Sequence, residues 1–178
     1  MRHEIRLSGS GGQGVITAGI ILARAAALFD GRNAVQTQSY GPEARGGASK
    51  SEVIISDGEI NYPKVRVPDV LVSLTQESLN KYIGGVKDGA VIIIDSLFVK
   101  SPPQGNYRVY NVPVIQTAAD KIGSLLTANI VMLGVLNRIY PAVSDEALIK
   151  TLTSLFSAKA SDLNIKAFGE GVALADKQ

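Results

Sequence analysis

The stretch EIRLSGSGGQG, residues 4–14, decides the fold class of this chain. Its first four residues alternate polar and apolar side chains, which is typical of a β-strand, and a glycine-rich run follows directly. From Val15 to Phe29 apolar residues recur near the helical period, and residues 34–39 alternate again. The sequence therefore predicts a strand, a glycine loop, a helix and a second strand. We expect a Rossmann-like βαβ opening whose second strand pairs in parallel with the first.

The remaining sequence continues the alternation of strands and helices. Two continuous apolar runs, at 70–74 and 90–95, are typical of buried parallel strands. The other expected elements are a strand at 107–112 and helices at 76–82, 116–140 (divided at Gly123), 144–157 (capped by Ser144) and 162–175 (weakened by Gly169 and Gly171). This order predicts one α/β domain over residues 1–178, a three-layer sandwich around a mainly parallel, mixed sheet.

One segment departs from the parallel pattern. Residues 51–56 look like a strand, Asp57-Gly58 is a strong hairpin signal, and residues 59–62 are suited to a short return strand. The sequence therefore predicts a small antiparallel hairpin insertion.

Composition excludes several kinds of site. Among 178 residues there is no cysteine and one histidine, His3, which we expect at the terminus or on a strand edge. Without thiolates the chain cannot form disulfides, cysteine-ligated zinc sites or iron–sulfur clusters, and one histidine cannot build a multi-histidine metal site. No catalytic or metal-ligating residue is therefore expected in this chain, and chemistry of those kinds must come from another chain.

Charge and hydropathy restrict the surroundings in which the chain works. The 18 basic and 16 acidic residues are dispersed, which gives a net charge of +2 and does not indicate a nucleic-acid partner. No apolar run is long enough for a membrane span, and charged residues interrupt the amino terminus where a secretory signal would be apolar. We therefore expect a cytoplasmic protein.

The glycine loop is the first candidate binding site. Gly9, Gly11 and Gly14 have the G-x-G-x-x-G spacing between a strand and a helix, which favours a phosphate-bearing ligand or another anion near the helix N-terminus. A tight structural turn remains the alternative. NAD is disfavoured, because residues 36–39 lack the acidic side chain that binds the ribose, and no Gly-Lys-Ser/Thr of a P-loop follows. Gln13 adds a polar group beside any ligand.

The second candidate is the loop at residues 40–47, YGPEARGG, after the second strand. Carboxyl ends of parallel strands meet at one edge of the sheet, so this loop and the glycine loop should converge. There Arg45 can clamp a phosphate or carboxylate, with Glu43 orienting it. The alternative is a solvated Glu–Arg pair on an ordinary loop.

Two further polar residues stay open at this level. Asp95, at the end of an apolar strand, is either a crevice residue or part of a strand-end turn. Asn129 either bonds across the crevice or satisfies its own helix. Next to Asn129, an apolar helix surface is expected to include an interface with other chains, at Ile130, Val131, Leu133, Val135 and Leu136.

Four motifs together resemble one known family. Residues 9–19 (GSGGQGVITAG), 40–47, 68–72 (PDVLV) and 129–134 (NIVMLG) look like the gamma subunit of the 2-oxoacid:ferredoxin oxidoreductases, in order and over most of the chain. The resemblance implies a complex, most simply one acting on 2-oxoglutarate, that oxidatively decarboxylates a 2-oxoacid to an acyl-CoA and reduces ferredoxin. It implies alpha, beta and ferredoxin-like delta partner subunits, which carry thiamine diphosphate, magnesium and iron–sulfur clusters.

By the same resemblance, this chain takes part in coenzyme A binding. The implied binding residues are Gly9, Gly11, Gly12, Gln13 and Gly14 in the glycine loop and Tyr40, Glu43 and Arg45 at the rim. The isolated chain is then expected to be inactive and colourless. Two alternatives stay open: a non-catalytic assembly subunit, and a free-standing nucleotide-binding oxidoreductase domain.

Overall fold

A computed structural model describes residues 1–40 and 47–178 of the chain. Its strands and helices, in chain order, are β1 (Arg2–Ser10), α1 (Val15–Arg24) with the π-helical turn η1 (Ala25–Phe29), β2 (Asn33–Ser39), β3 (Ala48–Ser56), β4 (Val70–Ser73), α2 (Gln76–Tyr82), β5 (Val91–Asp95), β6 (Arg108–Val112), α3 (Val114–Thr117) with the π-helical turn η2 (Ala118–Ile122), the 3₁₀ turn η3 (Leu125–Thr127), α4 (Ala128–Ile139), α5 (Asp145–Leu155) and α6 (Ala158–Ala175).

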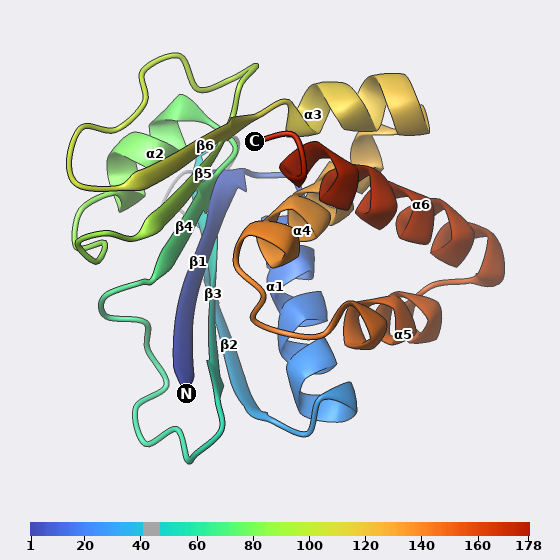
Figure 1. Cartoon of the computed structure of the whole chain (residues 1–178), viewed down its shortest axis with the longest axis horizontal. Helices are drawn as coiled ribbons and strands as arrows, with labels where there is room; N and C mark the ends of the chain where they lie inside the picture. The colour runs from blue at the N-terminus through green and yellow to red at the C-terminus, as the bar shows by residue number, and fades with distance from the viewer. Residues whose placement is uncertain (41–46) are drawn as a thin grey trace.

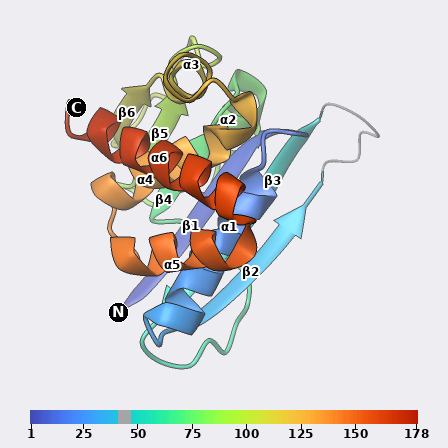
Figure 2. The same cartoon turned by 90° about the vertical axis from the view of Figure 1, so that its right-hand side faces the viewer.

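The six strands form one mixed sheet in the order β2-β3-β1-β4-β5-β6. Strands β1, β4, β5 and β6 are parallel neighbours, whereas β3 is antiparallel to both β1 and β2. Helices α1, α4, α5 and α6 cover one face of the sheet and α2 lies on the other (Figures 1 and 2). The predicted three-layer α/β sandwich with a mainly parallel, mixed sheet is confirmed.

Two details of the predicted topology are wrong. Strand β2 does not pair with β1, because β3 lies between them, and residues 59–62 form no return strand. Instead β3 pairs along its whole length with β1, from Ser10↔Ala48 to Arg2↔Ser56. The reason is burial: every residue from Ser51 to Ser56 is buried, and a strand covered on both faces requires hydrogen-bonded neighbours on both edges.

The main core lies between the sheet and the four-helix layer. The apolar surface of α4 that was expected to include an interface belongs to this core, since Ile130, Val131, Leu133, Val135 and Leu136 are all at most 1% exposed. That prediction is wrong, because α4 lies between α1 and α6 and has no free apolar face. A smaller cluster, around Leu71, Ile92 and Leu79, packs α2 against the opposite face.

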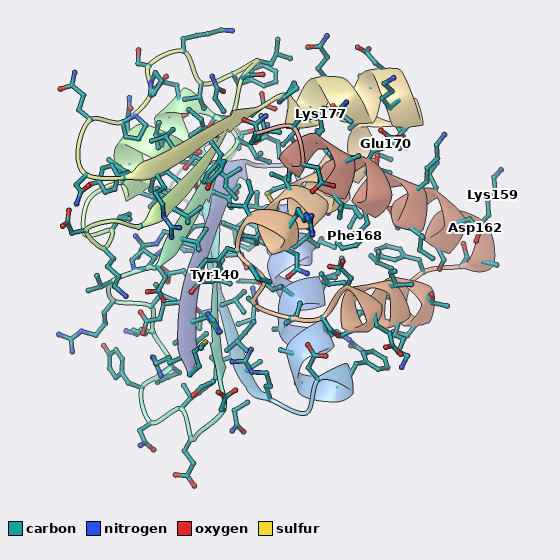
Figure 3. The ribbon with its side chains drawn as sticks, viewed as in Figure 1. Tyr140, Lys159, Asp162, Phe168, Glu170 and Lys177 are labelled. Atoms are coloured by element: carbon teal, nitrogen blue, oxygen red, sulfur yellow. The ribbon has the colours of Figure 1, made fainter. Side chains whose placement is uncertain are left out.

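Glycines bring α4 and α6 into backbone contact. A Cβ on Gly134 would lie 2.2 Å from the carbonyl oxygen of Phe168, and one on Gly171 would lie 2.1 Å from that of Val131. The glycines expected to weaken the last helix therefore have different roles: α6 is continuous, and Gly171 permits the close crossing. The buried side of α6 carries Phe168, whereas Lys159 and Asp162 on the same helix are exposed (Figure 3).

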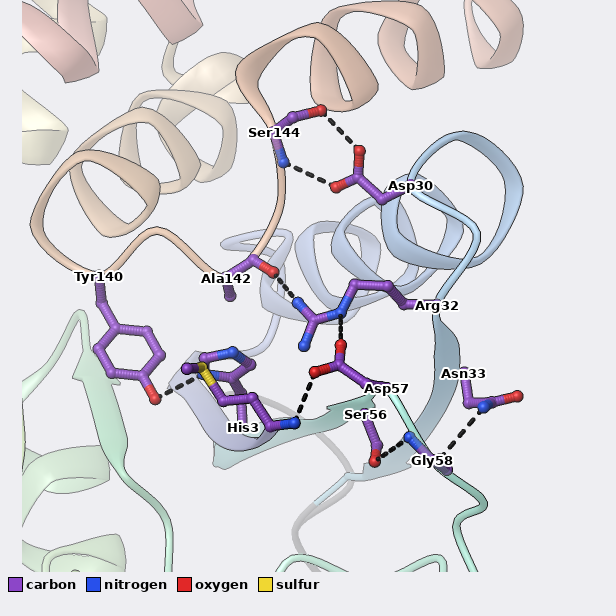
Figure 4. Close-up of polar contacts among 11 residues, drawn as sticks. His3, Asp30, Arg32, Asn33, Ser56, Asp57, Gly58, Tyr140, Ala142 and Ser144 are labelled. Atoms are coloured by element: carbon purple, nitrogen blue, oxygen red, sulfur yellow. Dashed lines mark hydrogen bonds and ion pairs between the residues drawn. The ribbon is translucent and has the colours of Figure 1, made fainter.

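At the end of the sheet where β1 begins, polar contacts connect the segment between α1 and β2 to the segments that follow β3 and α4 (Figure 4). The guanidinium of Arg32 donates to Asp57 Oδ1 at 2.8 Å and to the carbonyl oxygen of Ala142 at 2.7 Å. Asp30 accepts from the backbone N–H and the hydroxyl of Ser144, at 2.7 and 2.6 Å, and so joins the end of η1 to the N-cap of α5. These contacts join segments that are far apart in sequence.

His3 lies at the amino terminus, which was one of the two places expected for it, but not on a strand edge. It lies on the interior strand β1, is 8% exposed, and its Nδ1 is 2.8 Å from the hydroxyl of Tyr140. The two rings meet edge to face (Figure 4). Burial lowers the pKa of His3, and burial raises the pKa of Tyr140 to about 12. The pair is therefore a neutral, structural contact at neutral pH.

Candidate functional site

The glycine loop joins the end of β1 to the start of α1. Gly14 is the N-cap of α1 and has φ +73°, and Gly12 has φ +90°, conformations that favour glycine. Among the residues that the structure describes, no side chain caps α1. Within the described part of the chain, the backbone N–H groups of Gly11, Gly12 and Gly14 have no hydrogen-bond acceptor. The loop therefore presents unpaired donors at the positive end of a helix dipole, which is a suitable arrangement for an anion.

Gln13 shapes the loop from inside. Its side-chain Oε1 accepts a hydrogen bond from the backbone N–H of Ser10 at 2.8 Å. The backbone N–H of Gln13 donates in turn to the carbonyl oxygen of Ser10. A Cβ on Gly9 would lie 2.5 Å from this Oε1, so Gly9 makes room for the Gln13 side chain. The Nε2 of Gln13 has no hydrogen-bond partner among the described residues, but Gln13 is not one of the described residues that line the pocket at this loop.

A pocket of about 210 Å³ opens at the loop. It is lined by Ser10, Gly11, Gly12, Gly14, Val15, Ile16, Tyr40 and Ser49. Among the described residues, ideal Cβ atoms at Gly11 and Gly12 would meet nothing within 4 Å, so residues 1–40 and 47–178 leave the space beside the glycines open. Tyr40, the first residue of the second candidate loop, and Ser49, which follows that loop in β3, both line this pocket. Glu43 and Arg45, the charged residues expected at the rim, lie outside the described residues.

Asn129 contacts the glycine loop from the first turn of α4. Its Nδ2 donates to the carbonyl oxygen of Gly14 at 3.2 Å, so the side chain bonds across to the loop. Asn129 is 6% exposed, and its Oδ1 is buried without a hydrogen-bond partner in the part of the chain that the structure describes. Leaving a buried acceptor unpaired costs about 1 to 3 kcal/mol. Sequence reasoning did not connect Asn129 with Gly14, because their contact is non-local.

Asp95 takes the structural role. It is fully buried at the end of β5, where Oδ1 accepts from the N–H groups of Leu97 and Phe98 at 2.9 and 3.1 Å, and Oδ2 accepts from that of Ile115 at 2.9 Å. Burial raises the pKa of Asp95, and the hydrogen bonds from the backbone oppose that rise. The carboxylate thus closes a strand-end turn and holds the start of α3.

A second, larger cavity lies at the opposite end of the sheet and was not expected from the sequence. It measures about 440 Å³, and four of its five charged residues form ion pairs: Arg2 with Glu4 at 2.8 Å and Lys87 with Asp69 at 2.7 Å. The fifth, Arg66, lies over the ring of Tyr62 and has no carboxylate partner among the described residues. The contact with Asp69 raises the pKa of Lys87. Two of its three cations are already paired with carboxylates, whereas the backbone N–H groups of the glycine loop have no acceptor among the described residues, so the glycine-loop pocket is the better candidate for an anion.

Other kinds of site find no support in residues 1–40 and 47–178. No three histidine, aspartate or glutamate side chains there are grouped so that they could hold a metal ion. Of the helices described, none has the length and apolar character needed to cross a bilayer.

Comparison with known proteins gives one consistent family. Residues 4–174 match the model of the pyruvate ferredoxin/flavodoxin oxidoreductase family. The 2-oxoglutarate synthase subunit KorC of Methanocaldococcus jannaschii is 49% identical over 98% of this chain and 95% of its own length. The gamma subunit of the keto/oxoacid ferredoxin oxidoreductase of Geobacter sulfurreducens superposes with a TM-score of 0.92 at 46% identity, over 99% of this chain and 98% of that one.

A third relative was solved with ligands. The 2-oxoglutarate:ferredoxin oxidoreductase of Magnetococcus marinus, with 2-oxoglutarate, coenzyme A and succinyl-CoA bound, superposes with a TM-score of 0.88 at 25% identity, over 99% of this chain and 31% of that one. The fold, the motifs and these matches agree over nearly the whole length. The chain therefore belongs to the pyruvate ferredoxin/flavodoxin oxidoreductase family, as a gamma subunit of a multisubunit 2-oxoacid:ferredoxin oxidoreductase.

Proposed function

We propose that this gamma subunit serves a complex that oxidatively decarboxylates 2-oxoglutarate to succinyl-CoA and reduces ferredoxin. The observation that carries the substrate assignment is the 49% identity, over 98% of the chain, to a 2-oxoglutarate synthase subunit. The partners are alpha, beta and ferredoxin-like delta subunits, and electrons reach ferredoxin through them. Thiamine diphosphate, magnesium and the clusters belong to these subunits, in keeping with a chain that has no cysteine.

We further propose that the chain's own share of the reaction is to hold coenzyme A at the glycine loop. The unpaired N–H groups of Gly11, Gly12 and Gly14 suit a phosphate, and the open space beside Gly11 and Gly12 admits one. Gly9 and Gln13 keep the loop in shape, and Tyr40 supplies an exposed ring at the rim. Arg45, oriented by Glu43, adds a permanent positive charge.

The size of the pocket supports a shared site. Its volume of about 210 Å³ is below the roughly 300 to 1,000 Å³ common for small-molecule sites. The pocket therefore holds one phosphate-bearing part of the coenzyme, and the remainder lies against a partner subunit. Exposed apolar side chains close to Asn129, Leu125 (62% exposed) and Leu126 (88% exposed), supply a surface for such a partner.

The experiment that tests the function is purification of the native complex followed by assays with pyruvate, 2-oxoglutarate, 2-oxoisovalerate and indolepyruvate. We expect 2-oxoglutarate to be the preferred substrate. The isolated chain should be colourless and should reduce no dye in the presence of any oxoacid. Preference for another oxoacid would refute the substrate assignment, and cluster absorbance from the isolated chain would refute the division of roles.

Arg45 separates coenzyme binding from assembly. In the assembled complex, Arg45→Ala should raise the apparent KM for coenzyme A about ten- to a hundredfold, the loss of one charge-assisted contact of about 1.5 to 3 kcal/mol, and Arg45→Lys should recover part of it. Subunit association is measured on the same variants. Weakened association with an unchanged KM would instead indicate an assembly role for Arg45.

A further inference from the structure

Helix α4 carries a buried asparagine near each end, and the two are paired very differently. Asn137, 4% exposed, uses both its polar atoms: Nδ2 donates to the carbonyl oxygen of Val143 at 3.0 Å and to Asp145 Oδ1 at 2.7 Å, and Oδ1 accepts from the N–H of Val143. Within residues 1–40 and 47–178, Asn129, 6% exposed, uses only its donor, to Gly14. Packing and pairing account fully for Asn137 but leave a buried acceptor on Asn129.

The position of Asn129 is costly for stability alone. An apolar side chain of the same size would lose the bond to Gly14, but it would also remove the unpaired Oδ1 from the interior, so the two effects offset each other. The carbonyl oxygen of Gly14 would still accept from the N–H of Ala18 at 3.0 Å, as the first bond of α1. Folding therefore gains little from an asparagine here.

The contact does fix the geometry of the candidate site. A Cβ on Gly14 would lie 2.7 Å from Asn129 Nδ2, so the backbone of the loop lies directly against this side chain. In a trans peptide the carbonyl and the following N–H point in opposite directions. Because Asn129 and Ala18 both hold the carbonyl of Gly14, the N–H of Val15 is turned away from them, at the end of α1 that lines the pocket.

We propose that Asn129 is a positioning residue for coenzyme A: its Nδ2 holds the Gly14 carbonyl so that the N–H groups at the start of α1 are oriented for the phosphate before it binds. This inference rests on the proposed coenzyme site. Donors that are already oriented lose less freedom on binding, so affinity depends on Asn129 although it does not line the pocket itself.

The test compares Asn129→Leu with the matched control Asn137→Leu in the assembled complex. For Asn129→Leu we expect an apparent KM for coenzyme A raised about tenfold, an unchanged KM for the oxoacid and an unchanged or raised Tm. For Asn137→Leu we expect a lowered Tm, because Val143 and Asp145 lose their partners, and an unchanged KM for coenzyme A. A Tm of Asn129→Leu lowered as far as that of the control would make Asn129 a structural residue and overturn the proposal.

Asn129→Asp is the second variant, in case the leucine does not fold. It keeps an acceptor of the same shape but places an oxygen against the Gly14 carbonyl, so the KM for coenzyme A should rise again. A normal KM in this variant would also overturn the proposal, because the donor would then be dispensable.

Gly11→Asp, which puts a carboxylate into the pocket, distinguishes the two levels of inference. If Gly11→Asp raises the KM for coenzyme A and Asn129→Leu does not, the coenzyme site stands and the role of Asn129 is refuted. If neither variant changes it, the proposed coenzyme site itself is refuted.

Discussion

The turns that follow β1 and β5 lie at the same edge of the sheet, and both leave backbone N–H groups that need an acceptor. The two turns meet this need in opposite ways. After β5, the chain supplies its own anion: the carboxylate of Asp95 accepts from three backbone N–H groups, those of Leu97, Phe98 and Ile115. After β1, the N–H groups of Gly11, Gly12 and Gly14 have no acceptor among the described residues, and none of those residues fills the space beside Gly11 and Gly12.

The difference shows how function is separated from stability at this edge. The Asp95 turn is saturated and fully buried, so it can contribute to the fold but has nothing left for a ligand. The glycine loop leaves its donors unpaired and solvent-accessible, so its energetic benefit comes only when an external anion binds. Substitutions in the Asp95 turn should therefore change the stability of the fold, and substitutions in the glycine loop should change the binding of an anion.

The largest expected effect is that of Asp95→Ala. Removing the carboxylate strands three N–H groups, two of them in a turn and one at the start of α3, and should lower the free energy of unfolding by about 3 to 5 kcal/mol. Denaturant unfolding of the purified chain measures it. Asp95→Asn should cost less, since burial already disfavours the charged form and an amide oxygen still accepts. Equal losses in both variants would contradict this account.

Gly14→Ala should have the next largest effect, and a mixed one. Alanine at φ +73° is strained by about 1 to 2 kcal/mol, and its Cβ would meet Asn129 Nδ2 at 2.7 Å. We expect both a lower Tm and weaker coenzyme A binding by the complex, because the strain falls on the N-cap of α1. Combining it with Asn129→Ala should recover part of the stability. A full recovery would mean that the contact, and not the φ angle, dominates.

Gly11→Asp would make the glycine loop resemble the Asp95 turn. An aspartate at this position places a carboxylate in the space beside the unpaired N–H groups of the loop, so the variant supplies the loop with its own anion. The free energy of unfolding should change by less than about 0.5 kcal/mol, while the KM for coenzyme A should rise about tenfold, equivalent to 1.4 kcal/mol. Gly11→Asn, of the same shape but uncharged, is the control and should have a smaller effect on KM.

The smallest effect concerns the opposite end of the sheet, where the polar contacts are structural. Burial lowers the pKa of His3 below its ordinary value of 6.5, so the unfolded chain takes up the proton first. The stability that neutral His3 provides is therefore present above pH 6.5 and is lost as the pH falls through the lowered pKa. In His3→Leu, unfolding measured between roughly pH 7.5 and 5.5 should depend less on pH than in the unchanged chain. An identical slope would refute this assignment.

Local patterns predicted the elements well because they depend on neighbouring residues. The strand, glycine loop and helix at residues 4–29 and the Ser144 cap follow from alternation, helical period and capping chemistry. The sheet order was harder, since a βαβ unit ordinarily joins adjacent strands and nothing near residue 40 shows that another strand will separate them. The available signal was the apolar run from Val53 to Ile55, which is typical of a buried strand, and the Asp57-Gly58 hairpin signal obscured it.

The candidate site also contains residues that local sequence patterns predicted and residues that only tertiary packing brings together. The glycine spacing indicated the loop, and the topology rule correctly brought Tyr40 near it. The contact of Asn129 with Gly14 depends on how α4 packs beside α1, and the partners of Asp95 include the distant Ile115. Such pairings arise only once the helices are packed, so no local pattern predicts them.

The insertion of β3 between β1 and β2 also bears on the order in which the chain can fold. Strands β1 and β2 bond to β3 and not to each other, so a nascent chain that ends before residue 48 has two strands with no shared partner. The opening βαβ segment is thus not an autonomous folding unit during synthesis. Residues 1–40 must wait for β3 to emerge before their strands can pair. A fragment of residues 1–40 should therefore remain unstructured by circular dichroism, whereas one that extends through β4 and β5 should begin to form the sheet.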